Sequence, residues 1–572
     1  MACPPEAFAR LAADLRARHS WAEWDLVCFY DPGLVPPEGT TLLRSRRTPG
    51  FLLGLWLAAL RRAYGAVYVV LDDLERPDLP LLQFAALLPR VPKVILDTRG
   101  AVGSLSPRDG AAAVLAALAT PPLLALARLL TRLGLAAVRP RPARPPAPGA
   151  APRVGLVVPV LPDLSHTFVY REVLALTRRH PEWVVLVLEP GDRTVIHREA
   201  ALLEPLAIPV PRLSPGRYLL AYLRHWLRRP RAMADLIRFF QPHTASFGGG
   251  AVPDDRWGFL RLPWLHHVNH LAPGLMLAEA VRRHRLAYLH VYGATYPAVR
   301  ALVAHRLLGV PFSLSTFVDF DYVTPFHMLE PKLGLARFVV VATAFCASRL
   351  TERFPGLGPR LRVLRPSVPA DYARGKDLRP RDGRSRVVYI GRFVPKKGLD
   401  TLVEACALLR RRGLEVSCHL YGRGELEGAL RARIAAGGLT GAVVLEAPVP
   451  NERIYGVMNR DDVFVCPSRY MPDGERDGIP VTLIEAMAAG ITVVSTPVSG
   501  IPELIEDGAN GYLVPPDDSV ALADVLAALL GSEARRAAVA DAARRTVAEA
   551  FSLEAAATAL DGWISRESRS GA

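Results

Sequence analysis

Short apolar runs alternate with amphipathic stretches along most of the chain after residue 153. The first run is Val154–Val160, and the stretch Phe168–Arg179 after it has its apolar residues at helical spacing. A second series follows the polar stretch Asp371–Arg386, and its predicted strands are Val387–Ile390, Val416–Tyr421, Val443–Leu445, Val463–Cys466 and Thr492–Ser495. Because buried strands separated by helices are typical of parallel sheets covered on both faces, the pattern predicts an α/β protein with two Rossmann-like domains. Ligands of such sheets bind beyond the carboxyl ends of the strands, so the candidate site lies in the loops there.

A proline-rich run separates these domains from the N-terminal part of the chain. Residues 139–152 read RPRPARPPAPGAAP, which excludes helix and sheet and is typical of a semi-stiff spacer. Upstream, helical patterns such as Phe51–Arg62 alternate with apolar runs at Asp25–Tyr30, Val67–Leu71 and Val94–Leu96, which predicts an additional N-terminal α/β module. The expected units are an accessory module 1–138, the linker 139–152, a first Rossmann-like domain 153–370, a second 371–550, and a C-terminal helix and tail 551–572.

Length and charge narrow the possible partners. A chain of 572 residues is too long for one hydrophobic core, in agreement with several domains. Its formal charge of +15 predicts attraction to anionic lipid or phosphorylated substrates, although an arginine-rich composition alone also gives a positive charge. No nucleic-acid module or regular basic and aromatic code is present, so we expect no nucleic-acid partner. The scattered cysteines form no Cys-x-x-Cys pair and no export signal follows Met1, which favours a cytoplasmic location.

Two segments favour contact with a membrane surface. Ala111–Ala127 is apolar, but it contains two prolines and is shorter than the ~20 residues of a spanning helix. Arg217–Arg231 is rich in arginine and leucine, and its aromatic residues lie one helical turn apart at Tyr218, Tyr222 and Trp226. That pattern is typical of a helix in the headgroup layer, and a helix packed inside a domain is the alternative. We therefore expect peripheral attachment at the inner face of the cell membrane.

Two cations lie in the loop after the predicted strand Val387–Ile390. Arg392 carries a planar fork of donors and Lys397 a point charge, and side chains at this spacing can converge on a diphosphate. A solvated basic loop is the alternative. A glycine at position 391 lets the backbone turn tightly after the strand.

A short helix with clear limits is predicted between Asp477 and Gly490. Proline 480 suits the first helical position, and glycine 490 suits the residue just past the end. Free amides at the turn of Gly478 and Ile479, together with the helix dipole, form a seat for a phosphate. Asp477 and Glu485 can accept hydrogen bonds from sugar and ribose hydroxyls on either side of that phosphate. A helix cap and a solvated glutamate are the alternative.

At this point the residues from Val387 to about Leu530 resemble the C-terminal domain of glycosyltransferase family 4, which has the GT-B fold. The matching segments are IGRFVPKKGLDTLVEA, LYGRGELEGALR, VFVCPS, DGIPVTLIEAMAAG and SGIPELIEDGANGYLVP. A fainter resemblance covers Arg153 to about Pro366, where VGLVVPVLPDLSHTFVYREVLAL is similar to the opening of members that build exopolysaccharides.

The resemblance implies a role for each donor-side residue. Arg392 and Lys397 would hold the donor diphosphate, Glu485 the ribose and Asp477 the transferred sugar. Family members usually have glutamate at the position of Asp477, so the carboxyl here reaches one methylene less far. Members retain the anomeric configuration and need no metal or cofactor, because cationic side chains and the helix terminus offset charge on the departing nucleoside diphosphate.

The acceptor-side loop reads Ser165-His166-Thr167-Phe168, and the helix after it carries Arg171 and Glu172. Ser165, Arg171 and Glu172 are the predicted acceptor contacts. Ser165 as a simple helix cap is the alternative.

One departure from the family affects the catalytic assignment. Relatives commonly have a histidine near the position of Phe317, and phenylalanine cannot hydrogen-bond a sugar hydroxyl. Asp319, Asp321 or His166 could substitute, or activity could be lost. We favour Asp319, because it lies just past the predicted strand that ends near Phe317, and His166 is the second candidate catalytic residue.

No metal site is expected. His266, His267 and His270 share a helix face, but no further ligand cluster accompanies them. The aspartate pairs Asp72-Asp73 and Asp461-Asp462 are interpreted as surface or loop residues.

The resemblance thus implies a retaining glycosyltransferase of hexosyl type. Its donor would be a nucleotide sugar and its acceptor a lipid-linked molecule or polysaccharide of a bacterial envelope or exopolysaccharide. The alternative is a catalytically inactive nucleotide-sugar-binding or scaffolding subunit, which the phenylalanine at position 317 favours.

Overall fold

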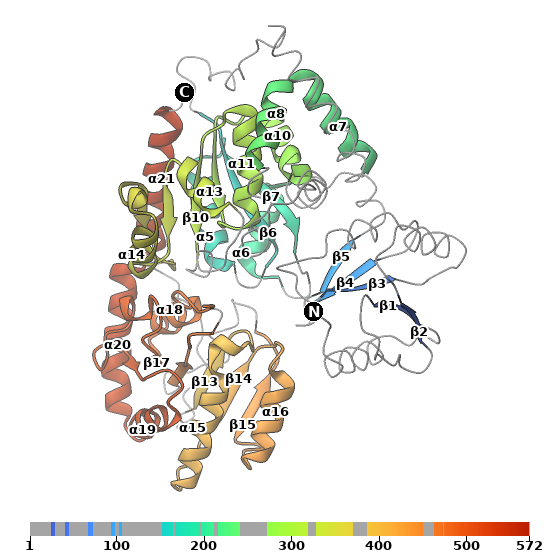
Figure 1. Ribbon diagram of the computed structural model, residues 1–572. Coiled ribbons are helices and arrows are strands. Elements are labelled where there is room, and N and C mark those ends of the chain that lie inside the picture. The colour runs from blue at the N-terminus through green and yellow to red at the C-terminus, as the bar shows by residue number, and fades with distance from the viewer. Residues whose placement is uncertain are drawn as a thin grey trace.

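The structure is a computed structural model that contains three β-sheets (Figure 1). It describes strands at 24–28, 40–44, 67–71, 93–97 and 102–105 in the N-terminal part of the chain. Beyond them it describes residues 152–163, 166–191, 193, 196–210, 215–240, 271–317, 328–369, 386–449, 463–472 and 474–570. The N-terminal strands form one sheet, and the other strands form two.

The N-terminal sheet has the order β2-β1-β3-β4-β5. Its strands are β1 (Trp24–Cys28), β2 (Thr40–Arg44), β3 (Val67–Leu71), β4 (Lys93–Asp97) and β5 (Val102–Leu105). The pairs among β1 to β4 are parallel, and β5 is antiparallel to β4. The apolar runs in the first hundred residues are therefore strands of one sheet, as predicted, and β2 and β5 were not predicted.

The first Rossmann-like domain, here called the first domain, is built on a parallel sheet of order β12-β11-β10-β9-β6-β7-β8. Its strands are β6 (Val154–Leu161), β7 (Val184–Pro190), β8 (Ala207–Pro209), β9 (Tyr288–Tyr292), β10 (Phe312–Thr316), β11 (Val339–Val341) and β12 (Leu361–Val363). Its helices include α5 (Thr167–Arg179), α6 (Arg198–Leu203), α7 (Pro215–Arg228), α8 (Pro230–Phe240), α10 (Ala272–His284), α11 (Tyr296–Leu308), α13 (Leu329–Leu335) and α14 (Ala344–Arg353). Successive residues of β6 such as Leu156 and Val157 have no exposed surface, so protein covers both faces of this strand.

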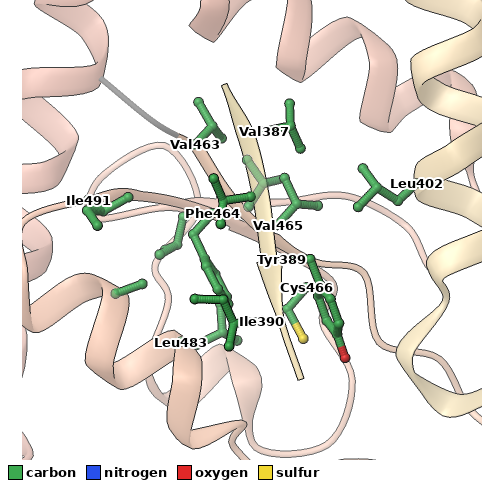
Figure 2. Packing of buried hydrophobic residues seen from close by; sticks show 14 of the residues in the cluster. Val387, Tyr389, Ile390, Leu402, Val463, Phe464, Val465, Cys466, Leu483 and Ile491 are labelled. Carbon is green, nitrogen blue, oxygen red and sulfur yellow. The ribbon is translucent and has the colours of Figure 1, made fainter. Parts of the chain in front are cut away.

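The second Rossmann-like domain, the second domain, has a parallel sheet of order β15-β14-β13-β16-β17-β18. Its strands are β13 (Val387–Ile390), β14 (Cys418–Tyr421), β15 (Val443–Glu446), β16 (Val463–Cys466), β17 (Thr492–Ser495) and β18 (Tyr512–Leu513). Its helices are η5 (Pro395–Lys397), α15 (Leu399–Arg411), α16 (Glu427–Ala436), α18 (Val481–Ala488), η7 (Ile501–Glu503), α19 (Ser519–Leu530) and α20 (Glu533–Ala550). Figure 2 shows Val463, Phe464 and Val465 of β16 among the buried side chains of β13 and α18. The predicted fold class, α/β with two Rossmann-like domains, is confirmed.

The last helix, α21 (Leu553–Ser570), returns to the first domain. It packs on α5, and Leu560 and Ile564 are fully buried in the same cluster as the strand β6. His180 Nε2 lies 2.8 Å from a carboxylate oxygen of Asp561. Figure 1 shows α20 and α21 in succession along one side of both domains.

The chain crosses between the domains at two places that pair with each other. The Val368 amide donates to the Phe551 carbonyl at 3.0 Å, and the Leu553 amide donates to the Val368 carbonyl at 2.9 Å. The two connections thus form one joint between the domains.

The helix α7 ends at Arg228 and α8 begins at Pro230, so the segment Arg217–Arg231 is not one continuous helix. Tyr222 and Trp226 are 0% and 4% exposed and belong to the core of the first domain. The expectation that these two aromatic side chains lie in a headgroup layer is therefore wrong, because the domain itself covers that face of α7. Among the helices that the structure describes, none is long and apolar enough to span a bilayer.

Candidate functional site

The loop after β13 is held against the loop after β16. Gly398 has a φ of 62°, and a Cβ atom there would lie 2.0 Å from the Pro467 carbonyl oxygen, so the approach requires glycine. The Arg469 amide also donates to the Lys396 carbonyl at 2.9 Å. The two loops therefore meet at the carboxyl ends of adjacent parallel strands, where ligands of such sheets bind.

Lys397 and Asp477, both predicted donor residues, are in direct contact. The ammonium Nζ of Lys397 donates to Asp477 Oδ2 at 2.7 Å, and the Ser468 hydroxyl donates to the same oxygen at 2.7 Å. Burial favours the neutral form of Asp477, but the ammonium groups of Lys397 and Lys396 outweigh it and lower the pKa of this carboxyl. Burial likewise opposes the charge of Lys397, but Asp477 outweighs it and raises the pKa of Lys397. The pair is therefore ionised.

A second lysine carries further positive charge to the same place. Lys396 Nζ donates to Glu475 Oε1 at 2.8 Å and lies 3.9 Å from Asp477 Oδ1. Arg392, at the start of the same loop, is exposed, and its positive charge opposes the rise in the pKa of Lys397 that Asp477 causes. Lys396 was not singled out from the sequence, although it stands beside Lys397 in the same loop.

The predicted helix after Asp477 is α18. Gly490 follows it with a φ of 73°, as expected for a residue past a helix end. Pro480 is the residue before the helix instead of its first residue, with a ψ of 123°. Gly478 and Ile479 are buried in the turn between Asp477 and the helix. The order of carboxylate, turn and helix is as the sequence indicated.

Glu485 of α18 contacts a residue that the sequence assigned to the acceptor side. Arg171 Nη2 of α5 donates to Glu485 Oε1 at 2.8 Å, and Arg171 Nε donates to Glu199 Oε1 at 3.0 Å. Burial raises the pKa of Glu199, but the guanidinium of Arg171 outweighs it and holds that pKa below its usual value. The structure thus brings the donor-side candidate Glu485 and the acceptor-side candidate Arg171 into contact. It also places Glu199 in this group of charged residues, and no sequence motif had indicated Glu199.

His166 and Phe317 lie at the same end of the first domain's sheet. His166 Nδ1 is 3.0 Å from Asp163 Oδ1, and its ring centroid is 6.0 Å from that of Phe317. Phe317 also packs edge-on against Phe168 at 5.0 Å and parallel to Tyr292 at 6.4 Å. An aromatic cluster therefore follows β10 at the position where the family resemblance implies a histidine.

A buried acid lies on α5 beside Arg171. Glu172 is 5% exposed, and burial raises its pKa to about 8. Burial raises the pKa of Tyr292, and a negative charge on Glu172 would raise it further. Glu172, a plausible acceptor contact by sequence, is therefore largely neutral at pH 7.

Several sequence candidates lie outside the described residues. They are Ser165, Asp319, Asp321, the histidines at 266, 267 and 270, and the aspartate pairs at 72–73 and 461–462. Within the described ranges, no group of three or more His, Cys, Asp or Glu residues could hold a metal ion.

Glu503 joins the two domains, which the segment SGIPELIEDGANGYLVP that contains it did not indicate. Its carboxylate accepts from the amides of Ala344 and Phe345 at 3.0 and 2.9 Å, at the start of α14. Arg365 Nη2 donates to the same carboxylate at 3.2 Å. A side chain of the second domain thus satisfies free amides of a helix in the first.

Part of the chain matches a known family. Residues 375–546 match the family described as Glycosyl transferases group 1. The amylovoran biosynthesis glycosyltransferase of Erwinia amylovora is 42% identical over 166 residues, 29% of this chain and 41% of that protein. The alpha-D-kanosaminyltransferase of Streptomyces kanamyceticus is 33% identical over 340 residues, 54% of this chain and 85% of that protein. The chain therefore spans less than half the length of the first relative and most of the second.

The fold is also similar to that of a solved structure. Anabaena HepE, crystallised with UDP and glucose, superposes with a TM-score of 0.52 and 15% identity over 72% of this chain and 99% of HepE. At this identity the similarity concerns the arrangement of the two sheets and their helices.

Proposed function

Because the chain belongs to the group 1 glycosyltransferases, we propose that it is a family 4 enzyme that transfers a hexose-type sugar from a nucleotide sugar. Its two Rossmann-like domains form the GT-B fold. The proposed reaction retains the anomeric configuration and uses no metal or cofactor. The bond between the anomeric carbon and the diphosphate breaks, a bond to an acceptor oxygen forms, and the proton of that hydroxyl is released.

One observation carries this proposal, the cluster of Lys396, Lys397 and Asp477 where β13 and β16 end. A lysine ammonium has three donors, so Lys397 can keep Asp477 and still donate to a diphosphate oxygen. Arg392 adds a second cation within electrostatic reach of the first. Fixed positive groups at this point would stabilise the negative charge that develops on the departing nucleoside diphosphate.

The remaining donor contacts follow from the order of residues around α18. The amides of Gly478 and Ile479 would face the diphosphate, Asp477 would hold the transferred sugar and Glu485 the ribose. On the acceptor side, Ser165, His166 and Asp319 would contact or activate the incoming hydroxyl.

We propose a lipid-linked or polysaccharide acceptor of a bacterial envelope or exopolysaccharide. The amylovoran biosynthesis glycosyltransferase is 42% identical to this chain over 166 residues, and it takes part in the synthesis of a bacterial exopolysaccharide. The proposed location is the cytoplasm, with peripheral attachment to the inner face of the membrane and no nucleic-acid partner.

The support for membrane attachment is the outer face of α7. Leu220, Leu223 and Leu227 are 67%, 37% and 85% exposed and lie along one side of the helix. Arg224 and Arg228 are exposed beside them. Exposed leucines with adjacent arginines suit insertion into anionic lipid headgroups.

A second function, a nucleotide-sugar-binding subunit without transferase activity, is favoured by Phe317. Its ring packs on Phe168 and Tyr292 and offers no hydrogen bond to a sugar. Donor binding without transfer or donor hydrolysis would support this alternative.

The test is a thermal-shift screen of the full chain with UDP-, GDP- and ADP-sugars, followed by donor hydrolysis and transfer assays with lipid acceptors. Lys397→Met is the site variant. Arg431→Met, which removes an exposed cation from α16, is its matched control. A wild-type protein that binds none of these nucleotides would refute the proposal.

A further inference from the structure

A buried ion pair connects α5 of the first domain to α18 of the second, both labelled in Figure 1. The side chains of Arg171 and Glu485 are 2% and 1% exposed, and their contact of 2.8 Å joins residues 314 positions apart in sequence. Glu199, with its side chain 19% exposed, accepts from Nε of the same guanidinium at 3.0 Å. Glu199, Arg171 and Glu485 therefore form a continuous chain of charges between the two domains.

The geometry of this chain is specific to arginine. A guanidinium is planar and presents its donors in fixed directions, so two carboxylates that accept from different nitrogens fix its orientation. Burial of separated charges is unfavourable unless each is paired and hydrogen-bonded, which favours the arrangement in which Arg171 contacts both acids. A lysine at this position would have a point charge and could not reproduce both directions.

The domains do not need this pair to stay connected. Glu503 already joins the second domain to α14, and α21 packs on α5. Arg171 is 3% exposed, and the contacts of its guanidinium include both Glu199 and Glu485. What the pair does fix is the position of the Glu485 carboxylate.

We propose that Arg171 is a positioning residue that holds Glu485 in the orientation that binds the donor ribose. This inference rests on the proposed function, in which Glu485 accepts from ribose hydroxyls. A carboxylate can accept several hydrogen bonds at once, so the bond from Arg171 to Oε1 is compatible with further bonds from a ribose. Because Arg171 belongs to the first domain, nucleotide affinity of the second domain depends on contact between the two.

The test measures dissociation constants of UDP, GDP and ADP by calorimetry on the full chain. Arg171→Met should weaken binding of the preferred nucleotide about tenfold, the size expected for loss of a hydrogen bond to a charged group. Arg171→Lys should restore part of that loss. Arg178→Met, which removes an exposed arginine from the same helix, should leave the constant within about twofold.

A double-mutant cycle separates positioning from a general structural role. In a Glu485→Gln background, Arg171→Met should change the dissociation constant by less than about twofold, because the carboxylate it positions is already gone. Equal effects of Arg171→Met in both backgrounds, or tighter binding by the single variant, would overturn the inference.

Glu199→Gln provides a second route if Arg171→Met does not fold. It leaves Arg171 and Glu485 in place and removes the acid that orients the guanidinium, so binding should weaken severalfold. Unchanged binding in Glu199→Gln would then count against the inference. A wild-type chain that binds no nucleoside diphosphate would refute the proposed function itself. If the wild type binds a nucleotide and the variants behave otherwise than expected, only the inference about Arg171 fails.

Discussion

Replacing Lys397 by methionine separates the binding role of this lysine from its structural one. On the sequence alone, Lys397 is a loop cation whose loss should leave the unfolding of the free protein nearly unchanged. The structure changes that expectation, because Lys397 and Asp477 form a pair whose side chains are 13% and 9% exposed. Removing one partner of a buried pair typically destabilises a protein by about 3–5 kcal/mol.

The expected loss of stability here is smaller, about 2 kcal/mol, because Asp477 keeps two compensating groups. The Ser468 hydroxyl still donates to Oδ2 at 2.7 Å, and Lys396 Nζ lies 3.9 Å from Oδ1. A second change, Asp477→Asn, removes the buried charge that has lost its nearest cation in Lys397→Met. The double variant should therefore recover most of the free energy of unfolding, measured from the urea transition of the second domain.

Nucleotide binding should respond differently. Loss of the hydrogen bond from the Lys397 ammonium to a diphosphate should weaken binding by about 1.5–3 kcal/mol, or about 10- to 150-fold. The double variant cannot restore that bond, so its affinity should stay low while its stability recovers. Calorimetric titration with a nucleoside diphosphate measures the affinity. Normal affinity in Lys397→Met would refute the placement of the diphosphate, and no recovery of stability in the double variant would refute the pairing argument.

Three further predictions concern other parts of the chain. Burial raises the pKa of Glu172 from 4.5 to about 8. Between pH 4.5 and 8 the folded state therefore keeps a proton on Glu172 that the unfolded state has lost. The free energy of unfolding then falls as the pH rises through this window. Glu172→Gln should therefore be more stable than wild type at pH 8, by roughly 1 kcal/mol or more, and similar to it near pH 5 in thermal unfolding. Gly398→Ala should destabilise the second domain by roughly 1–3 kcal/mol in urea unfolding. Gly413→Ala is the control and should cost less, because Gly413 also has a positive φ, 78°, but no atom lies within 4 Å of a Cβ added there. Leu227→Glu should reduce sedimentation with anionic vesicles without changing the thermal transition; equal sedimentation would contradict attachment through α7.

The sequence predicted the central strands and the donor loops because both depend on local information. Val387–Ile390 and Val463–Cys466 have the predicted bounds, since an apolar run buried on both faces needs no knowledge of its neighbours. Lys397 was selected because its loop follows a predicted strand, and Asp477 because it precedes a short predicted helix in the loop region after another strand. In a parallel sheet, the loops that follow the strands all lie at the carboxyl edge, whatever the order of the strands in the sheet.

Contacts between distant helices could not be predicted in this way. Nothing in the spacing of α5 indicates that Arg171 faces Glu485, because the approach of the two helices depends on how the domains are joined. Periodicity also identified the apolar face of α7 but not what covers it. Tyr222 and Trp226 pack inside the domain, where the sequence equally allowed lipid.

The return of α21 to the first domain affects the order in which the protein can fold. Leu560 and Ile564 complete a core whose other members include Val154 and Tyr170. During synthesis, that core stays open on one side until the ribosome has made the whole second domain and about twenty residues more. A fragment limited to residues 153–369 would expose the same apolar surface, so production of the first domain alone requires the segment 553–570, fused or supplied as a separate peptide.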